Sequence, residues 1–186
     1  TIHHGIPIEE FAYDPIGRDD LLFFGRIHHD KGAGEAIRAA KAVGRRLVMA
    51  GIIQDPEYHA REVAPFLDGD MIEFRGVLGG IERVRALGQA RAMLHLIGFD
   101  EPFGLSVIES MACGTPVIAY RRGSMPELIV DGVTGFLVDT FDQAIAPIER
   151  AGDIDRAACR QHVERYFTVD RMADRYLELY RQLIVC

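Results

Sequence analysis

Two carboxylates flank a turn near the middle of the chain, within the segment Asp100–Tyr120. Glu101 and Glu109 are eight positions apart, and Phe103–Leu105 lies between them. The turn leads into a helix, so the first backbone N–H groups of that helix are expected to lack partners within it. Such N–H groups, with Gly104 allowing close approach, bind phosphate or another anion. Because carboxylates beside an anion site suit hydrogen bonding to sugar hydroxyls, the segment predicts a site for a sugar nucleotide.

Two cations follow the first predicted strand. Gly25-Arg26 ends that strand, and Lys31-Gly32 comes five residues after Arg26. An arginine can bind two oxygens of a diphosphate at once, and a lysine adds a point charge. Solvated loop charges are the alternative interpretation, which the proximity of this loop to Phe103–Leu105 in a doubly wound sheet disfavours. No G-x-G-x-x-G pattern follows the strand and no G-K-[ST] occurs, so neither a dinucleotide fingerprint nor a Walker A loop is predicted.

Each carboxylate also has a plainer interpretation. Glu109 is expected about one turn into its helix, where the helix dipole stabilises a carboxylate by ~0.3–1 kcal/mol. Glu101 precedes Pro102, which favours an extended loop residue. Glu109 as a residue that stabilises the helix start, and Glu101 as an ordinary loop charge, are therefore the alternatives to the functional interpretation.

The seven histidines give little support for a metal site. His3-His4 and His28-His29 are adjacent pairs. Neighbours on a strand point to opposite faces, and neighbours on a helix diverge by ~100°. His95 lies in a predicted buried strand and is expected to be a neutral residue of the core or cleft. No metal ligand set is therefore predicted.

The elements that would position these residues alternate along the chain. Short apolar runs separated by helices indicate a parallel sheet covered on both faces. The predicted strands are Leu21–Gly25, Leu47–Gly51, Met71–Phe74, Ala92–Ile97, Val117–Tyr120 and Phe136–Val138. The predicted helices are Ala33–Val43, Glu57–Leu67, Ile81–Arg91, Leu105–Cys113 and Met125–Val130, followed by a helical region Asp142–Leu183. The fold class is therefore α/β, a doubly wound, Rossmann-like parallel sheet of about six strands with a helical C-terminal extension.

Composition limits the function classes. A chain of 186 residues with a net charge of −7 can bury one substantial core and lacks the basic excess expected of a nucleic-acid-binding protein. No apolar run approaches the ~18 residues that a membrane-spanning helix needs. Cys113, Cys159 and Cys186 have no metal or redox spacing, which favours reduced thiols in a cytoplasmic protein.

Four motifs occur in order: G-R-x4-K-G at Gly25–Gly32, E-x7-E at Glu101–Glu109, A-C-G-T-P-V-I-A at Ala112–Ala119, and G-S-M-P-E-L-I-V-D-G-V-T-G-F-L-V at Gly123–Val138. Together they resemble the nucleotide-binding C-terminal domain of GT-B glycosyltransferases, in the retaining group called family 4. The resemblance covers about Ile2–Val138 closely and the helical tail more loosely. It implies that this fold is one half of a GT-B architecture.

The resemblance implies a role for each motif residue. Arg26 and Lys31 would bind the donor diphosphate and stabilise its charge as it departs, and with Glu101 they are the implied catalytic residues. Glu101 and the backbone of Phe103–Leu105 would contact the transferred sugar and the phosphates, and Glu109 would accept hydrogen bonds from the ribose. The implied donor site is Gly25, Arg26, Lys31, Gly76, Val77, Glu101, Phe103, Gly104, Leu105 and Glu109.

The implied ligand is a UDP-, GDP- or ADP-linked sugar, with no cofactor and no metal. Gly76 and Val77 belong to the loop Arg75–Leu78, which would lie near the base. Two segments depart from the family pattern: Gly51–Pro56 lacks the usual small-glycine turn, and His95–Ile97 stands where a Pro-Ser pair is common. These departures change the expected contacts of the first segment and the shape of the cleft floor without removing donor binding.

The resemblance also divides the chain into three parts. Residues 1–20 would be a linker from a missing N-terminal domain, 21–140 the donor-binding domain, and 141–186 C-terminal helices packing on the same domain. The implied function is the donor half of a retaining hexosyltransferase, inactive without the domain that supplies the acceptor site. A sugar-nucleotide epimerase of the same fold and a noncatalytic nucleotide-sugar-binding module are the alternatives. The implied location is the cytoplasm, with the inner membrane face open through the missing domain.

Overall fold

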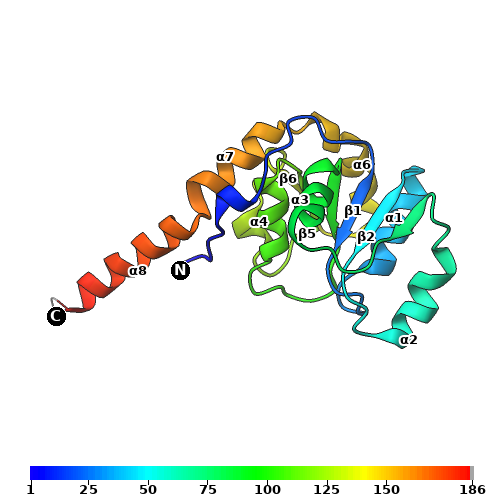
Figure 1. The fold of residues 1–186 in the computed structure, drawn as a ribbon, viewed down its shortest axis with the longest axis horizontal. Helices are drawn as coiled ribbons and strands as arrows, with labels where there is room; N and C mark the ends of the chain where they lie inside the picture. Colours follow the sequence, from blue (N-terminus) through cyan, green and yellow to red (C-terminus); the bar gives the residue numbers. More distant parts are fainter. Residues whose placement is uncertain (185–186) are drawn as a thin grey trace.

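Six parallel strands form one sheet in the computed structural model, which describes residues 1–184 (Figure 1). Their order is β3-β2-β1-β4-β5-β6, which confirms the predicted doubly wound sheet. The strands are β1 (Leu21–Phe24), β2 (Leu47–Ala50), β3 (Ile72–Phe74), β4 (Ala92–His95), β5 (Val117–Tyr120) and β6 (Gly135–Val138). Cys186 lies outside the described residues.

The apolar runs become central strands because helices cover both faces of the sheet. Every residue of β2 and β4 is buried. The chain order reverses between β1 and β4, which pair side by side with Leu21 opposite Ala92. In open α/β sheets ligands bind at this reversal, outside the carboxyl ends of the strands.

The longer helices pack in two groups. Helix α1 contacts α6, whereas α4 contacts both α3 and α7. Figure 1 shows the two groups on opposite faces of the sheet. The helices are α1 (Ala33–Val43), α2 (Pro56–Tyr58), α3 (Gly80–Gln89), α4 (Leu105–Ala112), α5 (Met125–Leu128), α6 (Phe141–Arg150), α7 (Arg156–Tyr166) and α8 (Val169–Ile184), with short 3₁₀ or π turns at Ile8–Glu10, His59–Val63, Ala64–Phe66 and Ala151–Asp153.

The single helix predicted over Glu57–Leu67 is wrong. The structure breaks it into α2, a π-helical turn at His59–Val63 and a 3₁₀ turn at Ala64–Phe66. Pro65 lacks the N–H that an α-helix interior needs, and its ring clashes with the carbonyl one turn earlier. The chain therefore changes its hydrogen-bond spacing before Pro65 and leaves the helix.

The N-terminal segment, residues 1–20, packs on the domain. Ile6 donates its N–H to the carbonyl of Phe167 at 2.9 Å, and both side chains are buried. Phe11 is buried as well. A Cβ at Gly5 would lie 2.1 Å from the carbonyl oxygen of Thr168, so this contact between backbones requires glycine.

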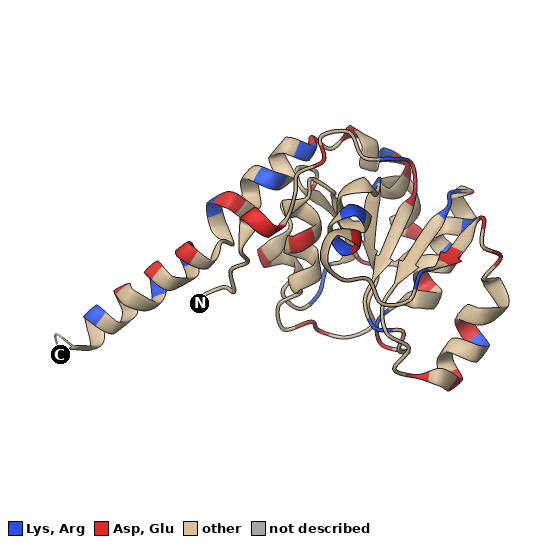
Figure 2. Ribbon diagram, viewed as in Figure 1, with Lys and Arg blue, Asp and Glu red and all other residues tan. Residues whose placement is uncertain are grey.

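The two last helices differ in how they contact the domain. Helix α7 packs against α4. Helix α8 does not: it buries no residue and extends away from the sheet (Figure 1). Acidic and basic residues are mixed along both helices (Figure 2). The large apolar residues that α8 leaves exposed are Val169, Tyr176, Leu177, Leu179, Tyr180, Leu183 and Ile184.

The Thr115 hydroxyl explains the Gly-Thr-Pro turn before β5. It donates to the carbonyl of Leu87 at 2.6 Å and accepts from the Arg156 guanidinium at 2.9 Å. Arg156 also donates to the carbonyls of Asp14 (2.8 Å) and Ala90 (2.9 Å). This motif therefore ties α3, α7 and the N-terminal segment together, which is a structural role.

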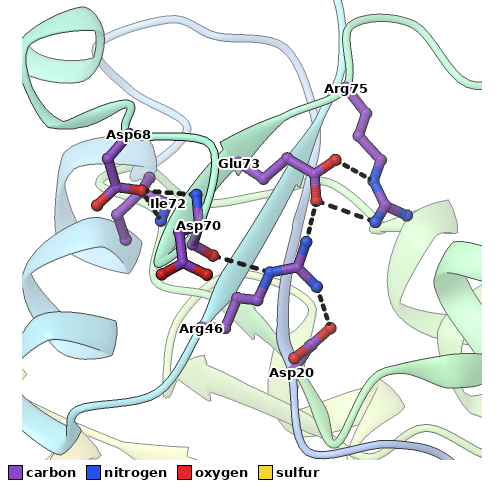
Figure 3. A network of polar contacts seen from close by, with 7 residues as sticks. All are labelled: Asp20, Arg46, Asp68, Asp70, Ile72, Glu73 and Arg75. Carbon is purple, nitrogen blue, oxygen red and sulfur yellow. Dashed lines mark hydrogen bonds and ion pairs between the residues drawn. The ribbon is translucent and has the colours of Figure 1, made fainter.

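A second charged network, which we call the Arg46 cluster, joins Asp20, Arg46, Asp70, Glu73 and Arg75 (Figure 3). Arg46 donates to the Asp20 carboxylate at 2.8 Å, to the Asp70 carbonyl at 2.9 Å and to Glu73. Arg75 binds Glu73 with two nitrogens, each at 3.0 Å. The Arg75 guanidinium holds the pKa of the Glu73 carboxyl below its usual range. The cluster fastens the segments before β1 and β2 to β3.

Two observations bear on location and thiol chemistry. Of the helices within residues 1–184, none is both long and apolar enough to cross a bilayer. Cys113 and Cys159 are free and buried, and burial raises the pKa of each thiol to about 12. Both side chains are therefore small core residues and not reactive thiolates.

Candidate functional site

A pocket of about 390 Å³ opens where the carboxyl ends of β1 and β4 meet. We call it the carboxyl-end pocket. Its position matches the ligand-binding crevice of doubly wound sheets. The residues that line it are His4, Phe23, Phe24, Gly25, Arg26, Lys31, Leu94, His95, Ile97, Glu101, Pro102, Phe103, Gly104, Leu105 and Ser106.

The loop between β1 and α1 brings the two predicted cations to this pocket. Arg26 and Lys31 both line it. The loop enters α1 through Gly32, whose φ is +74°, and a Cβ there would lie 2.1 Å from the carbonyl oxygen of Leu96. Only glycine tolerates that conformation and that contact, so the position of Lys31 depends on it.

The start of α4 forms the opposite wall. Gly104 precedes the helix with φ +95°, and a Cβ there would lie 2.8 Å from the Cε of Met125. Ser124, before α5, donates its backbone N–H to the carbonyl of Glu101 at 3.0 Å and its hydroxyl to that of Phe103. The first N–H groups of α4 have no acceptor within the helix, so this wall offers donors to an anion.

Lys31 and Glu101 meet across the pocket. The Lys31 Nζ donates to the Glu101 carboxylate at 2.6 Å, and both side chains are mostly buried. Nζ also lies 4.4 Å from the centroid of the Phe99 ring. An ammonium has three N–H donors and a carboxylate two oxygens. Each partner therefore keeps hydrogen-bonding capacity for a ligand while the pair persists.

Arg26 is exposed at the pocket wall and donates to the side-chain oxygen of Gln54. Gln54 belongs to the loop after β2, and its backbone N–H donates to the carbonyl of Ile27 at 3.1 Å. The side-chain contact leaves most of the five guanidinium donors of Arg26 available to an incoming anion.

Glu109 lies outside the pocket lining, although it shares a motif with Glu101. It is 7% exposed and forms an ion pair with Arg83 of α3. The guanidinium carbon of Arg83 lies 6.0 Å from the centroid of Phe24, which lines the pocket. Glu109 therefore borders the pocket through Arg83, a residue that the sequence argument did not single out.

His95 forms part of the pocket floor at the end of β4. It is 6% exposed, and its Nε2 has no hydrogen-bond partner within the described chain. Burial, with a smaller effect from Lys31, lowers the pKa of His95 to about 4. The imidazole is therefore neutral near pH 7, as predicted.

The structure brings seven of the ten predicted residues to one pocket: Gly25, Arg26, Lys31, Glu101, Phe103, Gly104 and Leu105. Gly76 and Val77 do not line it. Val77 is 71% exposed, and the carbonyl of Gly76 accepts the N–H of Gly51 at 2.8 Å, which places that loop beside the end of β2. His4 and Ser106 line the pocket without having been predicted, and no motif in the sequence indicates either residue.

His28 and His29 lie side by side in a turn. The rings of His28 and His29 lie 4.1 Å apart between centroids, tilted by 36°. They belong to a turn in which Lys31 donates its N–H to the carbonyl of His28 at 3.0 Å, so neither strand nor helix geometry applies. In the other adjacent pair, His3 contacts Glu127 and His4 lines the carboxyl-end pocket, and both rings lie near Phe103.

Comparison with known proteins identifies relatives that match most of the chain. The family model described as "Glycosyl transferases group 1" matches residues 13–151. The D-inositol 3-phosphate glycosyltransferase of Mycolicibacterium paratuberculosis is 32% identical over 186 aligned residues, which cover 91% of this chain and 42% of that protein. This chain therefore spans less than half the length of that relative.

Solved structures agree. AviGT4, a glycosyltransferase involved in avilamycin A biosynthesis, matches with a TM-score of 0.86 and 30% identity over 100% of this chain and 58% of its own. Anabaena Alr3699/HepE in complex with UDP and glucose matches with a TM-score of 0.81 and 19% identity, covering 95% of this chain and 55% of that chain. At that identity the second match shows the fold alone.

Proposed function

The chain belongs to the group 1 glycosyltransferases, and we propose that its carboxyl-end pocket binds the diphosphate and sugar of a nucleotide sugar. One observation carries the proposal: Arg26, Lys31 and the N-terminus of α4 line the same pocket. Cations and helix N-termini are the usual protein partners of phosphate oxygens. Alr3699/HepE, which shares this fold, was crystallised with UDP and with UDP-glucose, and this supports the choice of ligand.

In this proposal the Lys31–Glu101 pair serves both parts of the donor. Nζ of Lys31 donates to a phosphate oxygen with the hydrogens that Glu101 leaves free. The second carboxylate oxygen of Glu101 accepts from hydroxyls of the sugar. The ion pair, at 2.6 Å, thereby fixes the distance between the diphosphate and the transferred group.

The nucleoside is proposed to extend from the pocket toward α3. Glu109, aligned by Arg83, accepts from the ribose hydroxyls, and Gly76 with Val77 contacts the base. The exposure of Val77 leaves it accessible to a planar ligand. The Glu109 carboxylate is largely buried beside Arg83. To reach it, the ribose requires Arg83 to turn away or to keep only one carboxylate oxygen.

The proposed reaction is hexosyl transfer to an acceptor hydroxyl with retention at the anomeric carbon. Arg26, Lys31 and the dipole of α4 stabilise the negative charge that develops on the departing diphosphate. In this proposal these protein groups stabilise the leaving diphosphate, and no metal or cofactor is assigned that role. Since the relatives are much longer, acceptor binding is assigned to a further domain. The matched family lends no support to the epimerase alternative.

Calorimetry of this chain with UDP, GDP and ADP tests the donor site. We expect one of the three to bind, and Arg26→Ala with Lys31→Ala to weaken binding by at least about 100-fold, because each charge-assisted hydrogen bond contributes about 1.5–3 kcal/mol. Binding is expected to persist in EDTA.

Lys41→Ala with Arg45→Ala is the matched control, since it removes the same charges from the opposite end of α1. It is expected to leave binding unchanged. Absence of binding by all three nucleotides, or equal weakening by both double variants, would refute the donor site. Retention is tested separately in the full-length protein, by NMR of the anomeric configuration of the product.

A further inference from the structure

A cluster of His28, His29 and Asp55 lies on the two loops beside the carboxyl-end pocket. One potential metal-binding atom from each residue lies within 4.8 Å of the others. Among the described residues no other group of three or more histidine, cysteine or acidic side chains is arranged in this way. Two imidazoles and a carboxylate form a ligand set typical of zinc and related divalent ions.

Backbone pairing brings the three residues together from different loops. Ile27 is fully buried and forms a parallel bridge with Ile53. Its carbonyl accepts the N–H groups of Gln54 and Asp55, each at 3.1 Å. The loop after β1 and the loop after β2 are therefore joined at the residues just before His28 and Asp55, so the cluster has a fixed base.

The side chain of Asp30 contacts one of the proposed ligands, His28. Nδ1 of His28 lies 2.6 Å from the carboxylate of Asp30. With the proton on Nδ1, this contact fixes the tautomer and leaves the lone pair of Nε2 free. Metal-binding histidines in proteins almost always have such a carboxylate, carbonyl or water on the second nitrogen.

Asp55 is oriented for the same purpose. One carboxylate oxygen caps α2 by accepting the N–H of Tyr58 at 2.9 Å, and the other lies 3.4 Å from Nδ1 of His29. The oxygen that caps α2 is therefore fixed by the backbone, and the second oxygen faces His29. This second oxygen can bind an ion that His29 also binds.

From this geometry we infer a zinc site formed by His28, His29 and Asp55, with a water or substrate oxygen at the remaining position. Bonds of about 2.0–2.2 Å in a tetrahedron put the ligand atoms about 3.4 Å apart, so the cluster must contract slightly. His29 is 67% exposed at its side chain and can move without disturbing the core. The site is separate from Arg26 and Lys31 and does not depend on the proposed donor.

A bound ion would connect the site to the pocket wall. Gln54, which accepts from Arg26, is the chain neighbour of Asp55. An ion joining the two loops would restrict the backbone on which both Gln54 and Arg26 are positioned. Zinc is thus assigned a stabilising role at the edge of the pocket.

Calorimetry with Zn²⁺ alone tests the inference on the chain described here. We expect saturable binding of one ion per chain. His28→Ala and Asp55→Asn are each expected to weaken it by more than about tenfold, and Asp30→Asn by about tenfold through the tautomer of His28. Asparagine keeps the oxygen that caps α2, so Asp55→Asn leaves the fold intact.

His3→Gln is the matched control, because it removes one imidazole of the other adjacent pair, which is in no potential metal-binding group among the described residues. It is expected to leave the dissociation constant unchanged. Co²⁺ should give visible absorption bands that disappear in His29→Ala. Failure of Zn²⁺ to bind at millimolar concentration, or binding that survives Asp55→Asn and His28→Ala, would overturn the site.

Discussion

The two ends of the sheet carry charged clusters that are completed in different ways. Before β1 and β2, the Arg46 cluster satisfies its groups internally: Arg46 reaches two carboxylates and a carbonyl, and Arg75 binds Glu73 through two nitrogens. At the carboxyl ends, Lys31 and Glu101 share one contact and face a pocket. His95 below them has an unpartnered Nε2 within the described chain.

The difference separates charges that stabilise the fold from charges available to a ligand. The charged groups of the Arg46 cluster mostly bind one another, so we expect an added molecule to gain little there. A partly buried pair with unused donors and acceptors lacks part of the compensation for its desolvation until a ligand provides it. Ion pairs alone do not distinguish these cases, since both ends of the sheet contain them. What distinguishes them is the size of the pocket: about 390 Å³ at the carboxyl ends, against about 70 Å³ for the one that Asp20 and Arg75 line.

The largest expected effect concerns His95 and pH. Its pKa of about 4 is below the ~6.5 of the unfolded chain, so the unfolded chain binds this proton first as pH falls. The stability linked to His95 is therefore complete above pH ~6.5 and is lost toward pH ~4, a change of about 3 kcal/mol. Urea denaturation at several pH values measures it.

His95→Leu is expected to remove this part of the pH dependence, whereas His29→Leu, at an exposed position, should leave it in place. Parallel stability profiles for the wild-type chain and His95→Leu would show that the floor of the pocket is not an unsatisfied site. The contrast between the two ends of the sheet would then be lost.

The second prediction compares one variant from each end of the sheet. Arg46→Ala is expected to lower the free energy of unfolding by about 1–2 kcal/mol, because Asp20 and Glu73 lose a partly exposed partner, and to leave nucleotide binding unchanged. Arg26→Ala is expected to do the reverse, with about tenfold weaker binding and a stability change below ~0.5 kcal/mol. Denaturation and calorimetry on both variants measure the four effects. Similar effects of the two variants on either quantity would contradict the distinction.

The smallest expected effect tests the shared use of Lys31 and Glu101. Glu101→Gln should weaken the binding of a nucleotide sugar about tenfold more than the binding of the matching nucleotide, because only the sugar loses a charged acceptor. Glu73→Gln, in the Arg46 cluster, should change neither affinity. Competition calorimetry with the two ligands gives the ratio directly. An unchanged ratio in Glu101→Gln would remove the sugar contact from the proposal.

Much of the fold could be predicted because its signals are local. The boundaries of α1 at Ala33–Val43 and of β5 at Val117–Tyr120 match the predicted ones, since Gly32 and Gly44 bound the helix and a continuous apolar run marks the strand. The prediction of one helix over residues 57–67 was wrong because Pro65 interrupts the α-helical hydrogen bonds. Helix α8 buries no residue, because a sequence pattern does not say which surface covers a helix.

The candidate site could be predicted only in part. Arg26, Lys31 and Glu101 were identifiable from type and motif, and their common pocket followed from the strand order. Arg83 was not identifiable, because nothing near it in sequence marks it as the partner of Glu109. His28 and His29 were set aside by a rule for regular elements that a turn does not obey.

The sequence by itself determined the elements of the sheet, the glycines that allow its tight approaches, and the cations at the end of β1. These depend on short-range sterics and on the burial of apolar runs. Only the tertiary structure decided the pairs: Lys31 with Glu101, Arg83 with Glu109, and His29 with Asp55. Each joins residues at least 26 positions apart, and electrostatic and hydrogen-bond energies depend on distances that the strand order sets.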